Sequence, residues 1–362
     1  MPGPTRTFSA EFNDKYMTIR INPTGEFQNW PKIDLHRHLP GAIRLETWWD
    51  IVNQHQVPLP TQDRAELHRQ MTVRGQGDLK AFLRCFSVIN LCFVDAAAIQ
   101  RLTYEAIADA VAENIIYLEL RFSPTRMAQN ARISTAEALE AVIAGRDRAA
   151  RDFGQIQVEL IAGLSRGLGV PTCAVEAEII TTYAGRGIAG IDLLGNEADF
   201  PAAWFAPIFQ PIARRGQLGI TIHAGEAAGA DSVRAAVELL GATRIGHGLR
   251  AEEAPDVVAL LKARNITLEM CPTSNVQTGA AASLASHPLP RFLRNGLSVT
   301  INTDDPQVSQ IDLNHEYEVS TAMWGLTGPE LRQTLDYAVE AAFCTAPQKQ
   351  TIKNKLTRSR NQ

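Results

Sequence analysis

Alternating apolar and polar side chains mark residues 32–41, whose sequence is K-I-D-L-H-R-H-L-P-G. Ile33 and Leu35 alternate with polar neighbours, a period of two that predicts a half-buried strand ended by the Pro-Gly pair. His36 and His38 therefore lie two residues apart at the carboxyl end of this strand and point to the same side.

Seven further apolar runs alternate with helical patterns along the chain. The expected strands are at 115–122, 158–164, 188–194, 218–223, 244–248, 266–271 and 297–303. Helices are expected between them at 134–153, 173–183, 203–215, 231–240, 255–264 and 289–295, with Asp231 as the N-cap of the fourth. Eight strands that alternate with helices predict an α/β fold, a (β/α)₈ barrel rather than an open doubly wound sheet.

A long helical section at about 45–113 separates the first two strands. Within it, Leu79, Phe82, Leu83 and Phe86 fall at i, i+3, i+4 and i+7 and form one apolar stripe on a helix. Such stripes usually pack into a core. The position directly after the first strand also suits a lid over the barrel mouth, so we expect a helical lid insertion there.

The two ends of the chain differ from its centre. Residues 1–30 mix charged residues and prolines and are expected to form an irregular arm, with a short strand at 16–21 as its one candidate element. Residues 31–362 are expected to form a single barrel domain. Its last part, 313–362, is expected to add helices at the carboxyl end and to finish in a frayed basic tail.

Composition narrows the class of protein. The chain has 362 residues, of which 45% are hydrophobic and 20% charged, as is ordinary for a globular protein. A net charge of −4 leaves no basic patch for nucleic acid, so a small-molecule partner is expected. No window approaches the ~18 apolar residues that span a bilayer. Five cysteines without a C-x-x-C pair indicate free thiols in a reducing compartment, so a cytoplasmic protein without membrane contact is expected.

Reactive side chains gather where the expected strands end, which is where barrel enzymes place their active sites. A lone histidine at a strand end is more often a satisfied polar residue, and an isolated H-x-H is weak evidence for a metal. A whole group of buried imidazoles and carboxylates is costly unless it is paired or binds a metal. We therefore expect one shared metal site, with ligands His36, His38, His223 and Asp304.

Three nitrogens and one carboxylate suit Zn²⁺, although Fe²⁺, Mn²⁺ or Co²⁺ could bind the same set. Glu226 follows one ligand by three residues, and Gly225 allows the loop to turn, so Glu226 is the candidate general acid/base. His247 could hold a hydroxide or stabilise an oxyanion. Asp305 is expected to point at the substrate.

The other four histidines are expected at the surface or in packing positions. They are His55, His68, His287 and His315.

Seven motifs occur in one order along the chain. They are H-R-H-L-P-G-A-I (36–43), L-E-L-R-F-S-P (118–124), I-D-L-L-G-N-E (191–197), H-A-G-E (223–226), I-G-H-G (245–248), C-P-T-S-N-V-Q-T-G (271–279) and N-T-D-D-P (302–306). This set closely resembles the adenosine deaminase family over about residues 31–340. The resemblance implies a metal-dependent (β/α)₈ barrel with one Zn²⁺ per chain that converts adenosine to inosine and ammonia.

The resemblance also implies roles for individual residues. Glu226 would protonate purine N1, and a hydroxide oriented by His247 and Asp304 would attack C6. Asp305 would bond N7, and the backbone of Gly195 would bond N3. The apolar stripe of the insertion resembles the hydrophobic gate of the family, which implies a stripe without deep core burial.

The chain departs from the family pattern at Pro40, where an acidic residue usually contacts the ribose 5′-hydroxyl. Proline has neither a charge nor an N–H, so this contact must be missing or replaced. We therefore expect weak discrimination at the 5′ position, with adenosine or a 5′-modified adenosine as the preferred substrate. Asn196, where an aspartate is common, is a smaller departure.

Other functions fit less well. Adenine deaminase is the nearest alternative within the family, but it usually has an acidic residue at the position of Pro40. Many other metal-dependent amidohydrolases use two metals and a modified lysine at the end of strand four, whereas residues 192–195 contain none. Cytidine-type deaminases need H-x-E and P-C-x-x-C, which do not occur. A non-catalytic relative would normally have lost a ligand or the acid.

Overall fold

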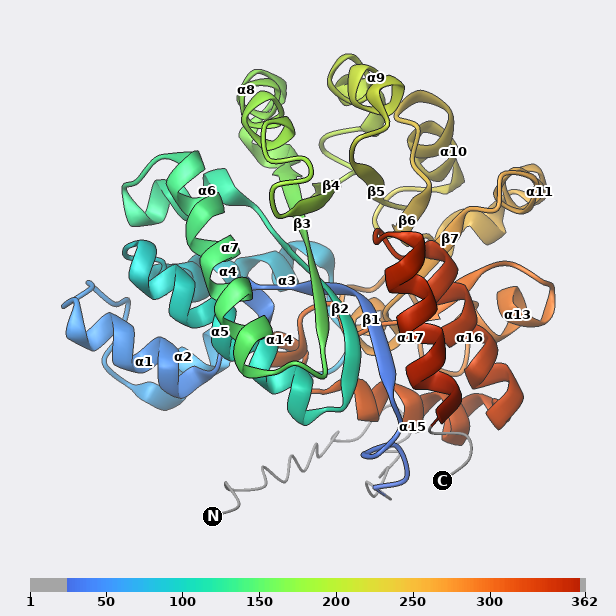
Figure 1. Cartoon of the computed structure of the whole chain (residues 1–362), viewed down its shortest axis with the longest axis horizontal. Helices are drawn as coiled ribbons and strands as arrows, with labels where there is room; N and C mark the ends of the chain where they lie inside the picture. The colour runs from blue at the N-terminus through green and yellow to red at the C-terminus, as the bar shows by residue number, and fades with distance from the viewer. Residues whose placement is uncertain (1–24, 359–362) are drawn as a thin grey trace.

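Eight parallel strands form the centre of the molecule in the computed structural model, which describes residues 25–358 (Figure 1). Each strand pairs with the next in sequence: β1 Lys32–His38, β2 Ile115–Phe122, β3 Gln157–Ser165, β4 Ile188–Leu194, β5 Gly219–Ala224, β6 Arg244–His247, β7 Thr267–Met270 and β8 Val299–Ile301. A bridge between Arg37 and Asp304 joins the end of β8 to β1. The predicted (β/α)₈ barrel is therefore confirmed.

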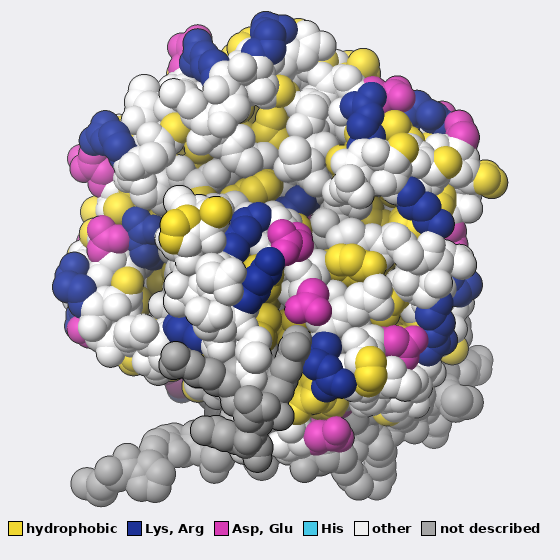
Figure 2. All heavy atoms as spheres, turned by 45° about the vertical axis from the view of Figure 1, so that its right-hand side comes forward, with side chains coloured by type: hydrophobic (Ala, Val, Ile, Leu, Met, Phe, Trp, Pro, Cys, Tyr) yellow, Lys and Arg dark blue, Asp and Glu magenta, His cyan; other side chains and the backbone are white. Residues whose placement is uncertain are grey.

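Helices surround the strands (Figure 1). They are α1 Leu45–Gln54, α2 Arg64–Met71, α3 Leu79–Arg84, α4 Phe86–Ile89, α5 Ala96–Ala112, α6 Pro124–Ala131, α7 Thr135–Asp152, α8 Val170–Thr181, α9 Ala206–Arg215, α10 Ala230–Leu239, α11 Pro255–Ala263, α12 Pro272–Gln277, α13 Leu289–Arg294, α14 Pro306–Ser309, α15 Leu313–Trp324, α16 Gly328–Ala341 and α17 Ala346–Arg358. No described helix has the length and apolar character needed to cross a membrane. On the face drawn in Figure 2, positive and negative side chains are interspersed.

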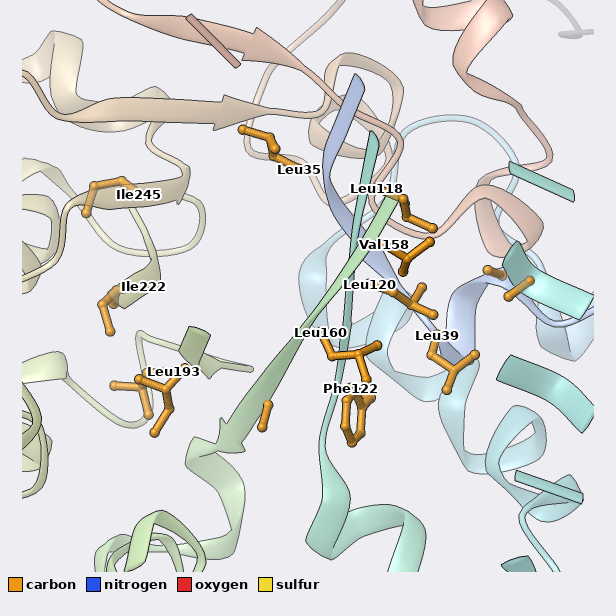
Figure 3. Close-up of a cluster of buried hydrophobic side chains, with 14 of the residues drawn as sticks. Leu35, Leu39, Leu118, Leu120, Phe122, Val158, Leu160, Leu193, Ile222 and Ile245 are labelled. Carbon is orange, nitrogen blue, oxygen red and sulfur yellow. The ribbon is translucent and has the colours of Figure 1, made fainter. Parts of the chain in front are cut away.

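The side chains of β2 show how the barrel is filled. Leu118, Leu120 and Phe122 lie beside the apolar side chains of β3, as Figure 3 shows, and all three are fully buried. Glu119 and Arg121 alternate with them and are fully buried as well. Because successive side chains of a strand point to opposite faces, the apolar set and the charged set lie on opposite faces of the sheet.

The buried charges of the barrel are paired with one another. Arg121 donates to Asp192 at 2.8 Å and to Glu269 at 2.6 Å. Arg244 donates to Glu269 at 2.6 Å and also pairs with Glu119. Since an unpaired buried charge is strongly unfavourable, this network satisfies the groups that the strands bring inside and connects β2, β4, β6 and β7.

The insertion between β1 and β2 contains α1 to α5, which confirms the expected helical section. The apolar stripe lies on two helices rather than one, because α3 ends at Arg84 and α4 begins at Phe86. Trp48 of α1 is fully buried and its indole N–H donates to the carbonyl of Ile89 at 3.0 Å. This contact connects α1 to the end of α4.

Several details differ from the sequence-based expectations. Asp231 is not an N-cap, because α10 begins one residue earlier and Gly229 occupies that position. The short helices α6, α12 and α14, which follow β2, β7 and β8, were not predicted.

All five cysteines are free, as expected. The expected strand at 16–21 and the last residues of the basic tail lie outside the described residues.

Candidate active site

A cavity of about 440 Å³ lies at the carboxyl ends of the strands. This volume lies within the range of roughly 300–1,000 Å³ that is usual for small-molecule sites. The lining includes the following predicted residues: His38, Leu79, Phe82, Leu83, Phe86, Gly195, His223, Glu226, His247, Asp304 and Asp305. His36, the remaining predicted residue, is fully buried and touches two of them. The fold thus brings all the predicted site residues together.

Four side-chain atoms of the predicted metal ligands converge. His38 Nε2 lies 3.3 Å from His36 Nε2 and 3.2 Å from His223 Nε2. Asp304 Oδ1 lies 3.2 Å from His38 Nε2 and 3.3 Å from His36 Nε2. Ligands placed about 2.0–2.1 Å from a tetrahedral ion are roughly 3.3 Å from one another. The spacing therefore fits one small metal ion.

Carboxylates behind the site orient two of these imidazoles. His36 Nδ1 lies 2.8 Å from Glu269, and His223 Nδ1 lies 3.0 Å from Asp192. Burial acts to raise the pKa of Glu269, but the charges of Arg121 and Arg244 hold this pKa well below its usual value. The carboxylates are therefore charged and accept the Nδ1 hydrogens, so the Nε2 lone pairs face the common centre.

A second group of possible ligands overlaps the first. It contains His36, His247, Cys271 and Asp304, whose ligand atoms lie within 4.8 Å of one another. Burial raises the pKa of Cys271 well above its usual value, so its thiol keeps the proton that a metal ligand must lose. The Nδ1 atom of His247 is already hydrogen-bonded to Asn275 at 2.9 Å. The first group is therefore the stronger candidate.

Two site residues have an uncommon backbone conformation. His247 has φ +64° and Asp304 has φ +63°, in the left-handed region that residues other than glycine rarely adopt. The strand edge holds Asp304 in this conformation, because its N–H donates to His36 and its carbonyl accepts from His38, both at 2.8 Å. Such conformations gather at functional sites because the surrounding structure enforces them.

Glu226 lies on a turn that one carboxylate organises. The side chain of Glu197 accepts backbone N–H bonds from Gly225 and Ala228 at 3.0 Å and from Glu226 and Ala227 at 2.7 Å. Gly225 has φ +71°, which agrees with the expectation that glycine allows this turn. Glu197 therefore fixes the backbone that presents the Glu226 side chain to the cavity.

Two carboxyl groups in the cavity wall hold their protons unusually tightly. Burial, followed by the charges of Asp304 and Glu197, raises the pKa of Glu226 to about 8. Burial and the same Asp304 raise the pKa of Asp305 well above its usual value. The Oδ1 atom of Asp305 is buried and has no hydrogen-bond partner among the described residues. Both groups can therefore donate a hydrogen bond to an unprotonated ring nitrogen.

The apolar side of the cavity comes from the insertion. Leu79, Leu83 and Phe86 line it and are half-buried. Phe82 lines it too, but only 2% of this residue is exposed. The expectation of a stripe without deep core burial is therefore wrong for Phe82, which belongs to the hydrophobic core cluster.

The remaining histidines divide into two kinds. His55 is exposed, and His68 and His315 are half-buried, in line with surface or packing positions. His287 is fully buried, and its Nε2 lies 3.1 Å from Asn275, the partner of His247. The packing expectation did not include this connection to the site.

Sequence reasoning gave no individual role to the supporting residues Asp192, Glu197, Glu269 and Asn275. The available signal for Asp192 and Glu269 was an acidic side chain inside an otherwise apolar strand. Because burying such a charge is costly, it indicates a buried partner. Nothing in the sequence identified the imidazole as that partner.

Polar residues lie around Pro40, where the sequence departs from the family pattern. The N–H of Leu39 donates to the carbonyl of Arg121 at 2.8 Å, so the chain after β1 runs beside the end of β2. Pro40, Ser123 and Arg126 all line the cavity there. The hydroxyl of Ser123 is buried without a hydrogen-bond partner among the described residues.

Arg126 is exposed and its Nε donates to Ser165 Oγ at 3.3 Å. Within the described part of the chain, no carboxylate forms an ion pair with Arg126. Among the described residues that line the cavity there is no other lysine or arginine.

Comparisons with known proteins find relatives that cover most of the chain. The family model described as adenosine deaminase matches residues 31–359. An adenosine deaminase of Serratia proteamaculans is 41% identical over 328 residues, which cover 90% of this chain and 98% of that protein. An adenosine deaminase of Shewanella loihica is 39% identical over 323 residues, covering 89% and 97%.

Solved structures share the fold. An adenine deaminase from Arthrobacter aurescens has a TM-score of 0.84 at 26% identity, covering 92% of this chain and 99% of that one. An amidohydrolase from Burkhoderia ambifaria with bound Zn has a TM-score of 0.82 at 25% identity, covering 97% and 95%. The N6-mAMP deaminase of Arabidopsis has a TM-score of 0.81 at 27% identity, covering 92% and 99%.

Proposed function

Because this chain belongs to the adenosine deaminase family, we propose that it catalyses the hydrolytic deamination of adenosine at C6, which gives inosine and ammonia. One observation carries this proposal. Four atoms with the spacing of metal ligands lie in the same cavity as Glu226, a carboxylic acid whose pKa is raised to about 8.

The proposal assigns one Zn²⁺ per chain to His36, His38, His223 and Asp304. Three imidazoles and one carboxylate match the ligands that zinc prefers, and a structural relative contains bound Zn. Zinc at such a site lowers the pKa of a bound water toward about 7 and so makes a nucleophile available at neutral pH. Fe²⁺, Mn²⁺ and Co²⁺ accept the same ligands, and metal analysis of the purified protein distinguishes them.

The protein side chains supply the acid, the orientation and the purine contacts. Glu226, protonated at neutral pH, gives its proton to purine N1 and makes C6 more electrophilic. His247 and Asp304 orient the attacking water. Asp305 donates to N7 through the carboxyl group whose Oδ1 has no hydrogen-bond partner among the described residues, and the backbone of Gly195 bonds N3.

The apolar stripe acts as the gate of this site. It covers the purine and keeps bulk water from the reacting atoms, which strengthens the electrostatic interactions inside. Its members are Leu79, Phe82, Leu83 and Phe86.

The proposed partner is a small-molecule purine nucleoside rather than a nucleic acid or a membrane. The five free thiols support the expected cytoplasmic location.

Adenine deaminase remains the nearest alternative, since a relative with a TM-score of 0.84 has that name. The curated relatives at 39% and 41% identity are adenosine deaminases, which places the nucleoside first. A two-metal amidohydrolase is disfavoured because residues 192–195 contain no lysine.

At the 5′ end of the nucleoside, Pro40 replaces the acidic residue that the family resemblance leads us to expect. A hydrogen bond to a charged partner contributes about 1.5–3 kcal/mol, so its absence removes roughly tenfold or more of the selectivity for a 5′-hydroxyl. We expect kcat/KM for adenosine to exceed that for 5′-deoxyadenosine by less than about twentyfold. A larger preference contradicts this part of the proposal.

Arg126 and Ser123 favour a second candidate, deamination of an adenosine that carries an anionic 5′ group. The guanidinium lines the cavity beside Pro40, and residues 25–358 offer neither a carboxylate partner for it nor a hydrogen-bond partner for the Ser123 hydroxyl. Arginine binds phosphate oxygens through paired N–H donors. The Arabidopsis relative named as an N6-mAMP deaminase is named for a nucleotide substrate.

One spectrophotometric panel tests both candidates. It compares kcat/KM for adenine, adenosine, 2′-deoxyadenosine, 5′-methylthioadenosine and adenosine 5′-monophosphate. Turnover of adenosine supports the first proposal, and turnover of adenine alone overturns it. Turnover of the monophosphate at a rate comparable to adenosine, with a decline at high salt, supports the second candidate.

Arg126→Gln is the matching variant, with Arg84→Gln as its control because Arg84 is exposed on α3 and does not line the cavity. We expect Arg126→Gln to lower the ratio of monophosphate to adenosine turnover by about tenfold, since one charge-assisted contact is lost. An unchanged ratio removes Arg126 from 5′ recognition and leaves adenosine deamination untouched.

A further inference from the structure

A chain of hydrogen bonds runs from the backbone of α13 to His247. It begins at His287, which is fully buried and stacks on Trp324 with 5.4 Å between the ring centroids. The backbone N–H of Leu289 donates to His287 Nδ1 at 3.2 Å. Burial lowers the pKa of His287 to about 3, so the ring is neutral at neutral pH. A neutral ring whose Nδ1 accepts carries its hydrogen on Nε2.

Asn275 is the next member of the chain. Its Oδ1 lies 3.1 Å from His287 Nε2 and 3.3 Å from the backbone N–H of Cys271. Both of these groups are donors, so together they fix which end of the amide is the oxygen. The amide nitrogen therefore faces His247, at 2.9 Å from its Nδ1.

The direction of the last hydrogen bond follows from chemistry. An amide nitrogen only donates, so Nδ1 of His247 must accept. A ring whose Nδ1 accepts a hydrogen bond carries no hydrogen on that atom and is therefore not an imidazolium. Its hydrogen is then on Nε2, the atom that lies 3.7 Å from Glu226 Oε2.

From this chain we propose that His287 is a positioning residue, which acts through Asn275 to hold His247 in the tautomer with hydrogen on Nε2. An Nε2–H can donate a bond to the oxygen that attacks C6 and to the oxyanion that forms. The same hydrogen removes the Nε2 lone pair, so His247 cannot replace His38 or His223 as a metal ligand. His287 thus helps to keep His247 as a hydrogen-bond donor that does not bind the metal.

The test uses ¹⁵N NMR of the metal-loaded protein labelled with ¹⁵N-histidine, together with kcat and KM for adenosine. A His247→Asn variant assigns the His247 signals by their loss. Nδ1 and Nε2 have different shifts when protonated, so the spectrum reports the tautomer without reference to activity. We expect the hydrogen of His247 on Nε2 in the wild-type protein.

Three variants separate this role from simple packing. Asn275→Asp replaces the donor to Nδ1 with an acceptor of the same shape and should move the hydrogen of His247 to Nδ1. His287→Phe keeps the stack on Trp324 but removes the donor to Asn275. His287→Gln keeps an N–H donor and is the conservative variant.

We expect Asn275→Asp to lower kcat about tenfold to a hundredfold, as is usual for residues that support a metal or catalytic histidine, with little change in KM. His287→Phe should lower kcat in the same direction and admit the Nδ1–H tautomer, whereas His287→Gln should restore both.

A wild-type spectrum with the hydrogen on Nδ1 overturns the proposal. An unchanged tautomer in both Asn275→Asp and His287→Phe overturns it as well. The inference about catalysis rests on adenosine deamination. If the wild-type protein does not deaminate adenosine, the proposed function fails, while the spectrum still decides the tautomer.

Discussion

The two walls of the cavity are built in different ways. The strand-end wall comes from residues at the carboxyl ends of strands or just after them: His38, His223, Glu226, His247, Asp304 and Asp305. Apart from His38, these residues are buried. Three of them bond to partners on other elements: His223 to Asp192 of β4, and Asp304 and His247 to Ser274 and Asn275 of α12. The lid wall comes from Leu79, Phe82, Leu83 and Phe86 on α3 and α4, and three of its four side chains are half-buried.

This difference separates chemistry from access. The strand-end wall is held by the hydrogen-bonded sheet and the paired charges beneath it, so its reactive groups keep fixed positions. The lid wall is held by apolar contacts of short helices, which are weaker and less directional. Changes in the strand-end wall should therefore lower kcat or metal affinity, whereas changes in the lid wall should mainly raise KM.

The largest effect is expected for Glu226→Gln in the strand-end wall. Glutamine keeps the shape and the N–H partners of the turn but cannot give a proton to N1. Since general acid catalysis contributes about 10²–10⁴-fold, kcat should fall about a thousandfold. Steady-state kinetics combined with metal analysis tests this. A variant that loses its metal, or one that keeps its activity, removes Glu226 from the proposed role.

Gly41→Ala should move Asp305. A methyl group at this position would lie 1.8 Å from Asp305 Oδ1, so the carboxyl group must shift. Misplacing a contact group by about 1 Å can cost ~10²-fold, and we expect a loss of kcat/KM of this order. Gly154→Ala is the control, because nothing lies within 4 Å of its added carbon. Equal activity of the two variants would show that Asp305 does not contact the substrate.

Ser274→Ala should weaken metal binding. The Ser274 hydroxyl donates to Asp304 Oδ2 at 2.6 Å and so helps to direct Oδ1 toward the ligand centre. Residues that orient ligands typically contribute 10–100-fold in metal affinity, and about tenfold is expected for this neutral hydroxyl. Competition with a chelator measures the affinity. Ser298→Ala, at a hydroxyl bonded to Thr267, should leave it unchanged.

The pH dependence reports the protonation of Glu226. Its pKa is raised to about 8, so the acid form that the reaction needs is present at neutral pH and is lost as the pH rises through this value. We expect kcat/KM to fall about tenfold between pH 7 and pH 9. A rate that stays constant over this range argues against a protonated Glu226 in the free enzyme.

The smallest effect is expected for Phe86→Ala in the lid wall. Phe86 is half-buried and lines the cavity, so its truncation removes part of the apolar surface that covers the substrate. We expect KM to rise about fivefold while kcat changes less than twofold, because only part of the ~1.5–3 kcal/mol of a fully buried side chain is lost. A fall in kcat larger than the rise in KM would contradict the claim that the lid wall controls access rather than chemistry.

Two features of the sequence predicted the barrel and the convergence of the candidate site residues. Apolar runs separated by helical patterns predicted the eight strands, and reactive side chains fell at the ends of those strands. The two walls of the cavity also differ in how well the sequence predicted their elements. The stripe at Leu79 to Phe86 was visible, but its break at Cys85 was not, because nothing in its periodicity marks a change of helix.

Contacts across the barrel could not be predicted from periodicity. Glu269 and Asp192 were visible only as charges inside strands, and their pairing with His36 and His223 depends on the closure of the sheet. The predicted N-cap at Asp231 was wrong for a local reason. The helix begins at Ala230, so Gly229 holds the N-cap position. The role of His287 depends on a contact between a loop and α12 that no spacing in the chain indicates.

The most direct test of the account is anomalous X-ray diffraction at the zinc edge from crystals of the zinc-loaded protein. We predict one strong peak per chain, about 2.0–2.2 Å from His36 Nε2, His38 Nε2, His223 Nε2 and Asp304 Oδ1. A peak bound instead to His247 and Cys271, or no peak among these four side chains, would contradict it.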